Sequence, residues 1–279
     1  MKKCIAILTR GYTKFSKYFD LVKRNVSIGK NLIDKSIDIL IFHEGNINIK
    51  QQIHIKKYTP LLNIIFINIS IKAFKKEKGH ITNVNLSYKH MCSFWFVDFW
   101  NFVESYDLLL RIDEDCILYN NIDDIFSKLE KYNIIAGGFM FDEYVVTIGL
   151  KDFTRNFIKE NSSNYSFFED EISNSGIQHF QHKFIHPNYK KTNILNEDIS
   201  NIPYGPYTNV IGLSLHNIRK NETFNKYVKS IDESNKIYKR RWGDLPLWGE
   251  SISYIFGHST CSIDNSIKYY HKSHEIHVN

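Results

Sequence analysis

Short apolar runs alternate with amphipathic segments over the first half of the sequence, and this alternation constrains the fold more than any other feature. Runs of this length are consistent with buried strands. The strands predicted in this way cover residues 4–9, 38–43, 63–69 and 107–112. Apolar side chains at helical spacing predict helices over residues 15–26 and 91–102. Strands and helices in alternation are typical of an α/β fold with a largely parallel sheet flanked by helices.

The second half of the sequence carries fewer regular patterns. Helices are predicted over residues 122–132, 224–231 and 247–256. Between residues 151 and 204 the periodicity fades, and Ser, Asn, Asp and His dominate, with Pro187 and Pro203 among them. We expect loops and short elements there, lying over one end of the sheet, because the segment is too short and polar for a separate domain.

Composition excludes several classes of protein. With 43% hydrophobic residues in 279, the chain is not disordered. Its four cysteines are too few and too scattered for a disulfide scaffold, and they form no C-x-x-C pair, which excludes a zinc ribbon or a thioredoxin site. The apolar run near the N-terminus ends at Thr9, too short for a signal peptide, and no later run approaches the ~20 residues of a membrane span. We therefore expect a soluble, cytoplasmic protein.

The charge balance does not favour nucleic-acid binding. Lys and Arg number 36 against 30 Asp and Glu, which gives a net charge of +6. The basic residues are spread along the chain and form no block of five or more like charges. A modest positive field of this kind would favour the approach of an anionic substrate.

Three consecutive acids, Asp113, Glu114 and Asp115, directly follow the predicted strand 107–112. In an open α/β sheet, ligands bind beyond the carboxyl ends of the strands. Asp113 and Asp115 are two residues apart, so they share one face of an extended chain. Paired carboxylates in this position suit Mg²⁺ or Mn²⁺ held against a diphosphate. The alternative is a solvated acidic turn, because two acids separated by one residue often occur by chance.

Two further segments contain candidate functional residues. In segment 240–246, Trp242 offers a ring that would stack on a sugar, and Asp244 offers a carboxylate that would bind sugar hydroxyls. The structural alternative is that Asp244 caps the helix that follows. Near the C-terminus, His271 ends a Tyr-Tyr-His triplet. A single histidine is more often structural than a ligand, and three other histidines lie nearby, so position alone does not select it.

Taken in order, segments 87–94, 106–115, 241–246 and 269–271 resemble the fungal α-1,2-mannosyltransferases, glycosyltransferase family 15. These enzymes carry a Ser-Tyr-Arg-His-Met-Cys-Arg-Phe type segment, an Arg-Val-Glu-Pro-Asp strand end, an Arg-Trp-Gly-Asp-Ala-Pro segment and a Tyr-Tyr-His in the same order. The resemblance runs from about Cys4 to His271. It is strong over residues 87–115 and 207–271 and weak over residues 142–204.

The resemblance implies a single GT-A-type domain over residues 1–279. Its nucleotide-binding part would cover about 1–137 and its acceptor-side part about 138–279. It implies a nucleotide-sugar donor, GDP-mannose in the family, a Mn²⁺ (or Mg²⁺) cofactor, and a carbohydrate acceptor. The implied reaction is an α-1,2-type transfer of mannose with retention of anomeric configuration.

The resemblance also implies a metal site. Asp113 stands where the family has its metal-binding Glu, and Asp115 matches the second carboxylate. His271 matches the metal-ligating His of the family. Glu114 replaces the Pro between the two acids, and the exchange of Glu for Asp at position 113 shortens the reach to the metal by one methylene.

Other residues fall on the two sides of the implied site. Tyr88 matches a Tyr near the nucleotide, Arg10 stands where the family places an Arg at the nucleotide pocket, and Asp113 also lies on the donor side. Trp242 and Asp244 match the acceptor-side motif. Asp244 is the candidate that accepts or orients the proton of the acceptor hydroxyl.

The sequence departs from the family at Asn209, where the family has a Glu proposed to act at the anomeric carbon. Retention through a covalent intermediate needs a carboxylate there. Three alternatives remain open. The acceptor attacks on the face that the diphosphate leaves, with Asn209 supporting positive charge on the sugar; or Glu197 or Glu250 supplies the carboxylate; or the chain is an inactive nucleotide-sugar-binding relative. The fungal enzymes are membrane-anchored, so compartment and acceptor cannot be carried over from them. An enzyme of another class that uses a paired-acid metal site, such as a nucleotidyltransferase, is the more distant alternative.

Overall fold

The computed structural model describes residues 1–9, 15–74, 86–142, 144–161, 203–271 and 274–276. Arg10 and Glu197, two residues considered above, lie outside this range, as do the residues between 162 and 202. Within the described residues, no helix is both long enough and apolar enough to cross a membrane.

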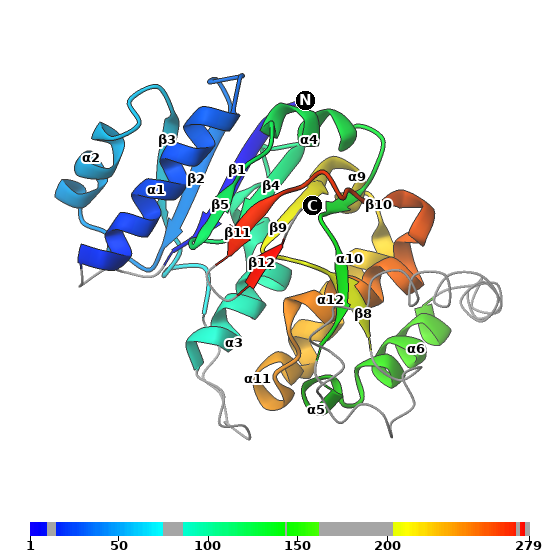
Figure 1. Cartoon of the computed structure of the whole chain (residues 1–279). Helices are drawn as coiled ribbons and strands as arrows, with labels where there is room; N and C mark the ends of the chain where they lie inside the picture. Colours follow the sequence, from blue (N-terminus) through cyan, green and yellow to red (C-terminus); the bar gives the residue numbers. More distant parts are fainter. Residues whose placement is uncertain (10–14, 75–85, 143, 162–202, 272–273, 277–279) are drawn as a thin grey trace.

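A seven-stranded sheet forms the centre of the molecule, with the order β10-β6-β9-β4-β1-β2-β3 (Figure 1). Its strands are β1 (Lys3–Leu8), β2 (Asp38–His43), β3 (Asn63–Asn68), β4 (Leu108–Ile112), β6 (Ile134–Ala136), β9 (Val210–Ser214) and β10 (Cys261–Ile263). Neighbouring strands are parallel except at β9, which runs antiparallel to both β4 and β6. The predicted, largely parallel sheet is confirmed, and β6, β9 and β10 were not predicted as strands.

Successive side chains of the central strands enter two separate cores, as the pleat of a strand requires. Ile5 and Ile7 of β1 belong to one core and Cys4 and Ala6 to the other. The core that contains Ile5 and Ile7 is covered by helices α1 (Phe15–Asn31), α2 (Ile49–Lys57) and α4 (Ile122–Lys128). Both faces of the sheet are thus buried, which explains why its strands read as continuous apolar runs.

The opposite face is covered by the aromatic-rich segment that begins with α3 (Leu86–Ser93) and by helices from the second half of the chain (Figure 1). After α3 the chain continues as a π-helix over Phe94–Asp98 and a 3-10 helix over Phe99–Phe102. The helix predicted over 91–102 therefore begins five residues earlier and changes its winding. Its aromatic side chains form the centre of this core, with Phe94 and Phe96 fully buried.

The other helices of this side are α5 (Tyr144–Thr147), α6 (Leu150–Asn161), α9 (Leu215–Arg219), α10 (Glu222–Ser234), α11 (Lys236–Arg240) and α12 (Asp244–Ser251). A π-helix at Ile252–Phe256 and a 3-10 helix at His258–Thr260 follow α12. Helix α6 occupies the start of the segment where we expected loops and short elements, so that expectation was wrong for residues 150–161. The helices predicted over 224–231 and 247–256 are confirmed in α10 and in α12 with its π-helical continuation.

Two small sheets bring distant segments to one end of the central sheet. Strand β5 (Cys116–Leu118) pairs antiparallel with β11 (Tyr269–His271), and β11 pairs with β12 (His274–Ile276). The register places His271 opposite Cys116. In the second sheet, β7 (Phe139–Phe141) pairs with β8 (Tyr204–Pro206).

Two glycines allow β8 to lie directly against α12. A Cβ added at Gly205 would overlap the backbone carbonyl of Leu245, and one added at Gly249 would overlap the carbonyl of Tyr204. Because the obstacle is backbone on both sides, no side-chain rotation relieves it. This contact fixes α12, and with it the start of that helix at Asp244, against the rest of the fold.

We expect Gly249→Ala to lower the free energy of unfolding by about 1–3 kcal/mol or more, because overpacking against backbone outweighs the better helix propensity of alanine. The matched control is Gly29→Ala in α1, where the added Cβ would meet only the Leu62 side chain at 3.7 Å. That variant should be neutral or stabilised by up to ~1 kcal/mol. Urea unfolding of both variants measures the difference, and equal stabilities would contradict the close backbone contact.

Candidate functional site

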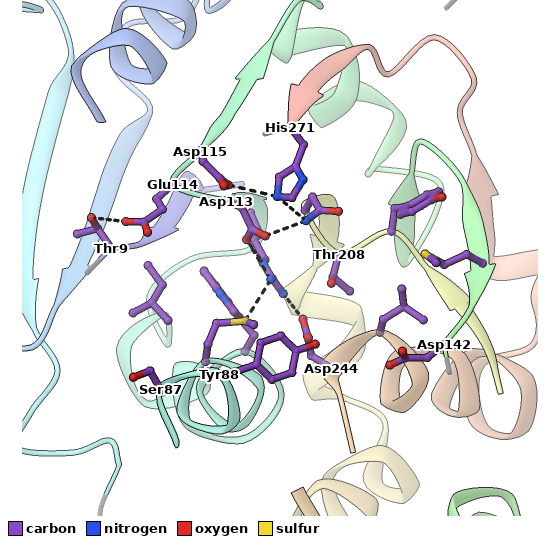
Figure 2. Close-up of a pocket in the computed structure, with 18 of the residues that line it drawn as sticks. Thr9, Ser87, Tyr88, Asp113, Glu114, Asp115, Asp142, Thr208, Asp244 and His271 are labelled. Atoms are coloured by element: carbon purple, nitrogen blue, oxygen red, sulfur yellow. Dashed lines mark hydrogen bonds and ion pairs between the residues drawn. The ribbon is translucent and has the colours of Figure 1, made fainter. Parts of the chain in front are cut away.

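A cavity of about 560 Å³ opens beyond the carboxyl ends of β1 and β4, where the predicted fold places a ligand (Figure 2). Residues from both halves of the chain line it. They are Leu8, Thr9, Glu44, Phe74, Ser87, Tyr88, Met91, Trp95, Arg111, Asp113, Glu114, Asp115, Met140, Asp142, Tyr207, Thr208, Asn209, Asp244, Leu245 and His271. The site residues predicted from the sequence are in this set, except for Trp242 and for Arg10, which lies outside the described residues.

Arg111 on β4 connects the two sides of the cavity. Its Nε donates a hydrogen bond to Oδ1 of Asp113 at 3.0 Å, and its Nη1 donates to Oδ2 of Asp244. The guanidinium carbon lies 4.5 Å from the centre of the Trp95 ring. Arg111 is only 2% exposed, so both ion pairs lie largely out of water. No role was predicted for Arg111 from the sequence, although its place at the end of a strand, next to the acids, was the available signal.

The acids and the histidine predicted to hold a metal meet at one end of the cavity. Oδ1 of Asp115 lies 3.3 Å from Nε2 of His271, which β11 delivers by pairing with β5. Asn209 donates a hydrogen bond from Nδ2 to Oδ2 of Asp113 at 3.1 Å, and the same nitrogen lies 3.4 Å from Nε2 of His271. The structure therefore gathers Asp113, Asp115, His271 and Asn209, which come from segments about 100 and 160 residues apart in the sequence.

The donor atoms at this end fit a divalent cation. Candidate ligand atoms of Asp115, Cys116 and His271 lie within 4.8 Å of one another. Carboxylate oxygens and an imidazole nitrogen suit Mn²⁺, and oxygens suit Mg²⁺. The Cys116 thiol is fully buried, and this burial raises its pKa well above the usual value. This burial disfavours the thiolate, the form that binds metals, so the carboxylate oxygens and the imidazole nitrogen are the better ligands.

Electrostatics at this end are tightly coupled. Burial raises the pKa of Asp113, and the Arg111 guanidinium and the Asn209 amide offset part of that increase. For His271, burial alone would lower the pKa, but the hydrogen bond to Asp115 and the charges of Asp115 and Asp113 raise it. The site as a whole is electronegative and would be stabilised by a bound cation.

On the β1 side, Thr9 donates a hydrogen bond from its hydroxyl to Oε2 of Glu114 at 2.9 Å (Figure 2). Tyr88 lines the cavity from α3, and the guanidinium of Arg241 lies 4.8 Å from the centre of its ring. Glu114, which replaces the Pro of the family, thus ties the acidic turn to the end of β1.

Trp242 does not line the cavity, which corrects the expectation that its ring stacks on a sugar. It is 1% exposed, and its indole nitrogen donates a hydrogen bond to the carbonyl of Ile148 at 3.2 Å. Its ring contacts Phe153 edge-on at 5.4 Å between centres. The apolar neighbours of this tryptophan come from α6, and a single sequence gives no signal of that contact.

Asp244 lies inside the cavity, but it does not cap α12. Gly243 is the N-cap residue, and Asp244 is the first residue of the helix. Its carboxylate is 4% exposed and pairs with Arg111. The structural alternative for Asp244, a helix cap, is therefore wrong, and the residue faces the same space as the predicted metal ligands.

Glu250 does not replace the missing carboxylate at the anomeric centre. It is 1% exposed and does not line the cavity. Burial raises its pKa to about 7, and the Lys151 charge, a hydrogen bond with Thr154 and the Arg155 charge offset part of that shift. Two carboxylates that line the cavity, Glu44 and Asp142, were not singled out from the sequence. Asp142 follows β7 and pairs with Arg241 at 3.8 Å.

No family model matches the sequence. A curated relative, glycolipid 2-alpha-mannosyltransferase 1 of Candida albicans, is 26% identical over 201 residues, which cover 70% of this chain and 42% of the relative. A solved structure of core-mannan synthase A from Aspergillus fumigatus in its Mn/GDP form superposes with a TM-score of 0.72 and 14% identity. That superposition covers 98% of this chain and 75% of the other.

The chain is similar to the mannosyltransferases of glycosyltransferase family 15. A mannosyltransferase structure from S. cerevisiae also covers 98% of the chain and 70% of its own length, with a TM-score of 0.70 and 16% identity. These superpositions confirm the predicted GT-A fold. The names of the relatives agree with the predicted class, a glycosyltransferase of mannosyltransferase type. The chain spans about two fifths of the length of the curated family-15 relatives it matches.

We expect Arg111→Met to lower the free energy of unfolding by about 3 kcal/mol, because it leaves the buried Asp244 carboxylate, and the partly exposed Asp113 carboxylate, without their cation. Adding Asp244→Asn should recover part of this loss, since it removes one of the two carboxylate charges that the substitution leaves unpaired. Denaturant unfolding of the two single variants and the double variant measures the coupling. Strictly additive effects would contradict the bridging role of Arg111.

We expect the stability of the protein to depend on pH through Glu250. A glutamate carboxyl in an unfolded chain has a pKa of about 4.3, whereas burial in the folded protein raises the pKa of Glu250 to about 7. The folded state therefore binds more protons between these values, and the free energy of unfolding falls as the pH rises through that range. Glu250→Gln removes this dependence. The free energy of unfolding of the variant, relative to that of the natural chain, should therefore rise by about 1–3 kcal/mol between pH 5 and pH 8. Urea unfolding at both pH values tests this, and parallel stabilities would contradict it.

Proposed function

We propose that the chain is a metal-dependent glycosyltransferase that moves a hexose from a nucleotide diphosphate to a sugar hydroxyl. The donor we propose is GDP-mannose, and the transfer is of the retaining, α-1,2 type. The observation that carries this proposal is one cavity that Asp113, Asp115 and His271 line at one end and that a separate carboxylate, Asp244, lines beyond Arg111, which pairs with both Asp113 and Asp244. The GT-A fold shared with the family-15 mannosyltransferases supports it.

In this proposal Asp113, Asp115 and His271 hold Mn²⁺ or Mg²⁺. The cation supplies charge that stabilises the leaving diphosphate. Asn209 and Arg111 keep Asp113 in place through hydrogen bonds at 3.1 Å and 3.0 Å. Tyr88 and the Thr9–Glu114 pair line the side where the nucleotide would lie.

On the acceptor side, Asp244 orients the incoming hydroxyl or takes its proton. Arg111 holds the Asp244 carboxylate in one position, which favours a fixed geometry for the acceptor. Attack on the face that the diphosphate leaves accounts for retention without a carboxylate at position 209. The bond from the acceptor oxygen to the anomeric carbon forms as the bond to the diphosphate breaks. Because the Asn209 Nδ2 is bound to Asp113, its Oδ1 is the atom left to support positive charge on the sugar.

The second candidate is a nucleotide-sugar-binding protein without transfer activity. It is favoured by one observation, the amide of Asn209 at the position of the carboxylate that the family uses. The two candidates differ in turnover and agree in nucleotide binding. A panel of GDP- and UDP-sugars, with Mn²⁺ and with sugar acceptors, separates them: sugar release or transfer supports the enzyme, and binding without turnover for every donor supports the binding protein.

We expect Asp115→Ala to abolish the Mn²⁺-dependent part of nucleotide affinity, a loss of about tenfold or more, because a cation ligand and its charge are removed. Isothermal titration with GDP at fixed Mn²⁺, and the shift in melting temperature on ligand addition, provide the measurement. The control is Glu130→Ala, an exposed acid after α4 that does not line the cavity. Unchanged Mn²⁺ dependence in Asp115→Ala would overturn the assignment of the metal site.

A further inference from the structure

The part of the cavity formed by β7 and the start of α12 contains a carboxylate that the proposed reaction does not use. Asp142 follows β7 and lines the cavity, as do Asp244 and Leu245 at the start of α12 (Figure 2). A Cβ added at Gly243 would lie 3.3 Å from Oδ2 of Asp142, so this side chain reaches the backbone at the start of α12. Asp142 and Asp244 therefore stand on neighbouring backbone segments and face one space.

The backbone around Asp142 is held rigidly. Strand β7 pairs with β8, and the register sets Met140 opposite Gly205. Gly205 in turn lies against the carbonyl of Leu245 so closely that no Cβ fits between them. The chain thus builds β7, β8 and the start of α12 as one unit, and a group bound there would meet a preformed surface.

Arg241 forms an ion pair with Asp142. Its Nη1 is 3.8 Å from Oδ1 of Asp142, and its guanidinium covers the ring of Tyr88 at 4.8 Å. This nitrogen is buried and has no hydrogen-bond partner among the described residues, so the ion pair is its main polar contact. Arg241 has a φ of 65°, in the left-handed region that a residue with a side chain seldom adopts. Backbone strain of this kind persists where the surroundings fix the residue.

The chemistry of this end differs from that of the metal end. Asp142 and Asp244 each face the cavity with an arginine paired to them, Arg241 and Arg111. A charged carboxylate accepts hydrogen bonds and donates none, so its natural ligand here is a neutral donor such as a hydroxyl. Among the described residues, this end of the cavity has no group of potential metal ligands that would hold a diphosphate through a cation. Met140 and Leu245 add apolar surface for the C–H face of a ring.

We propose that Asp142, held in place by Arg241, binds hydroxyls of the acceptor sugar and, with Asp244, forms the acceptor subsite. This proposal rests on the proposed function. Asp142 contacts the acceptor in it, and Arg241 is a positioning residue, since it does not itself line the cavity. The two carboxylates, on adjacent backbone segments, each accept hydrogen bonds. They therefore favour a sugar ring with two neighbouring hydroxyls over a ligand with one hydroxyl.

The test compares Asp142→Asn with the natural chain in acceptor kinetics and in nucleotide binding. We expect the acceptor KM to rise by about tenfold or more, because a hydrogen bond to a charged group is replaced by a weaker one. The affinity for GDP in the presence of Mn²⁺ should change less than twofold. An unchanged acceptor KM would overturn the proposal, and so would a loss of nucleotide affinity equal to the loss for the acceptor.

A matched control is Asp264→Asn, which breaks a carboxylate–lysine pair with Lys128 at the other side of the fold. It should leave the acceptor KM unchanged. Circular dichroism and the melting temperature establish that each variant is folded. Arg241→Met should raise the acceptor KM as Asp142→Asn does, and Arg241→Lys should restore part of it. Equal values for the Met and Lys variants would exclude positioning through charge.

Direct binding separates failure of this proposal from failure of the proposed function. Saturation-transfer NMR with the methyl α-glycosides of mannose, glucose and galactose, in the presence of GDP and Mn²⁺, needs no turnover. A signal from one glycoside that Asp142→Asn removes supports the subsite even if no donor is turned over. No signal with the natural chain, or an equal signal with the variant, overturns the subsite even if transfer is observed.

Discussion

The site depends on the pairing of the Arg111 guanidinium with two carboxylates. This guanidinium lies at the end of β4, nearly without contact with water, and holds one carboxylate on each side, Asp113 and Asp244. These two acids belong to segments more than 120 residues apart, and buried charges of this kind are tolerated only when paired. The strand end and the start of α12 are therefore brought together by a requirement for charge balance. Apolar packing of β8 against α12 provides the same alignment independently.

Much of the fold was predictable from the sequence because apolar runs mark its central strands and apolar residues at helical spacing mark several of its helices. The runs that form β1, β2 and β4 are largely buried on both faces and so are mostly apolar, and the edge strand β3 is partly exposed but keeps an apolar centre. Strands β6, β9 and β10 and helix α6 were missed. Strand β9 is short and contains Gly212, which packs against Leu129 where a Cβ would be crowded. Helix α6 mixes charged and apolar residues at a spacing that becomes clear only once its buried face, with Phe157 and Ile158, is known.

The candidate site was predictable where its residues follow a strand and otherwise only through resemblance. The acidic triplet marked the end of β4, and the structure brings Asp115 and His271 within 3.3 Å. No spacing rule links position 115 to position 271, because their contact arises from the pairing of β5 with β11. The expected role of Trp242 was wrong for a related reason: whether an aromatic ring faces a cavity or a core depends on its neighbours in space. Asp142 escaped notice because its partner, Arg241, is 99 residues away.

The position of His271 on β11, far along the chain from β5, has a consequence for folding during synthesis. Strand β11 adds to β5, whose sequence is complete about 150 residues earlier. A chain emerging from the ribosome can form the central strands and bury much of its aromatic core while this edge of β5 still lacks its neighbour. It acquires the full set of candidate ligands only after residue 271 has been synthesised. Until then, Asp113 and Asp115 form an acidic turn without the imidazole, and ligand binding that needs all three residues waits until β11 has paired with β5.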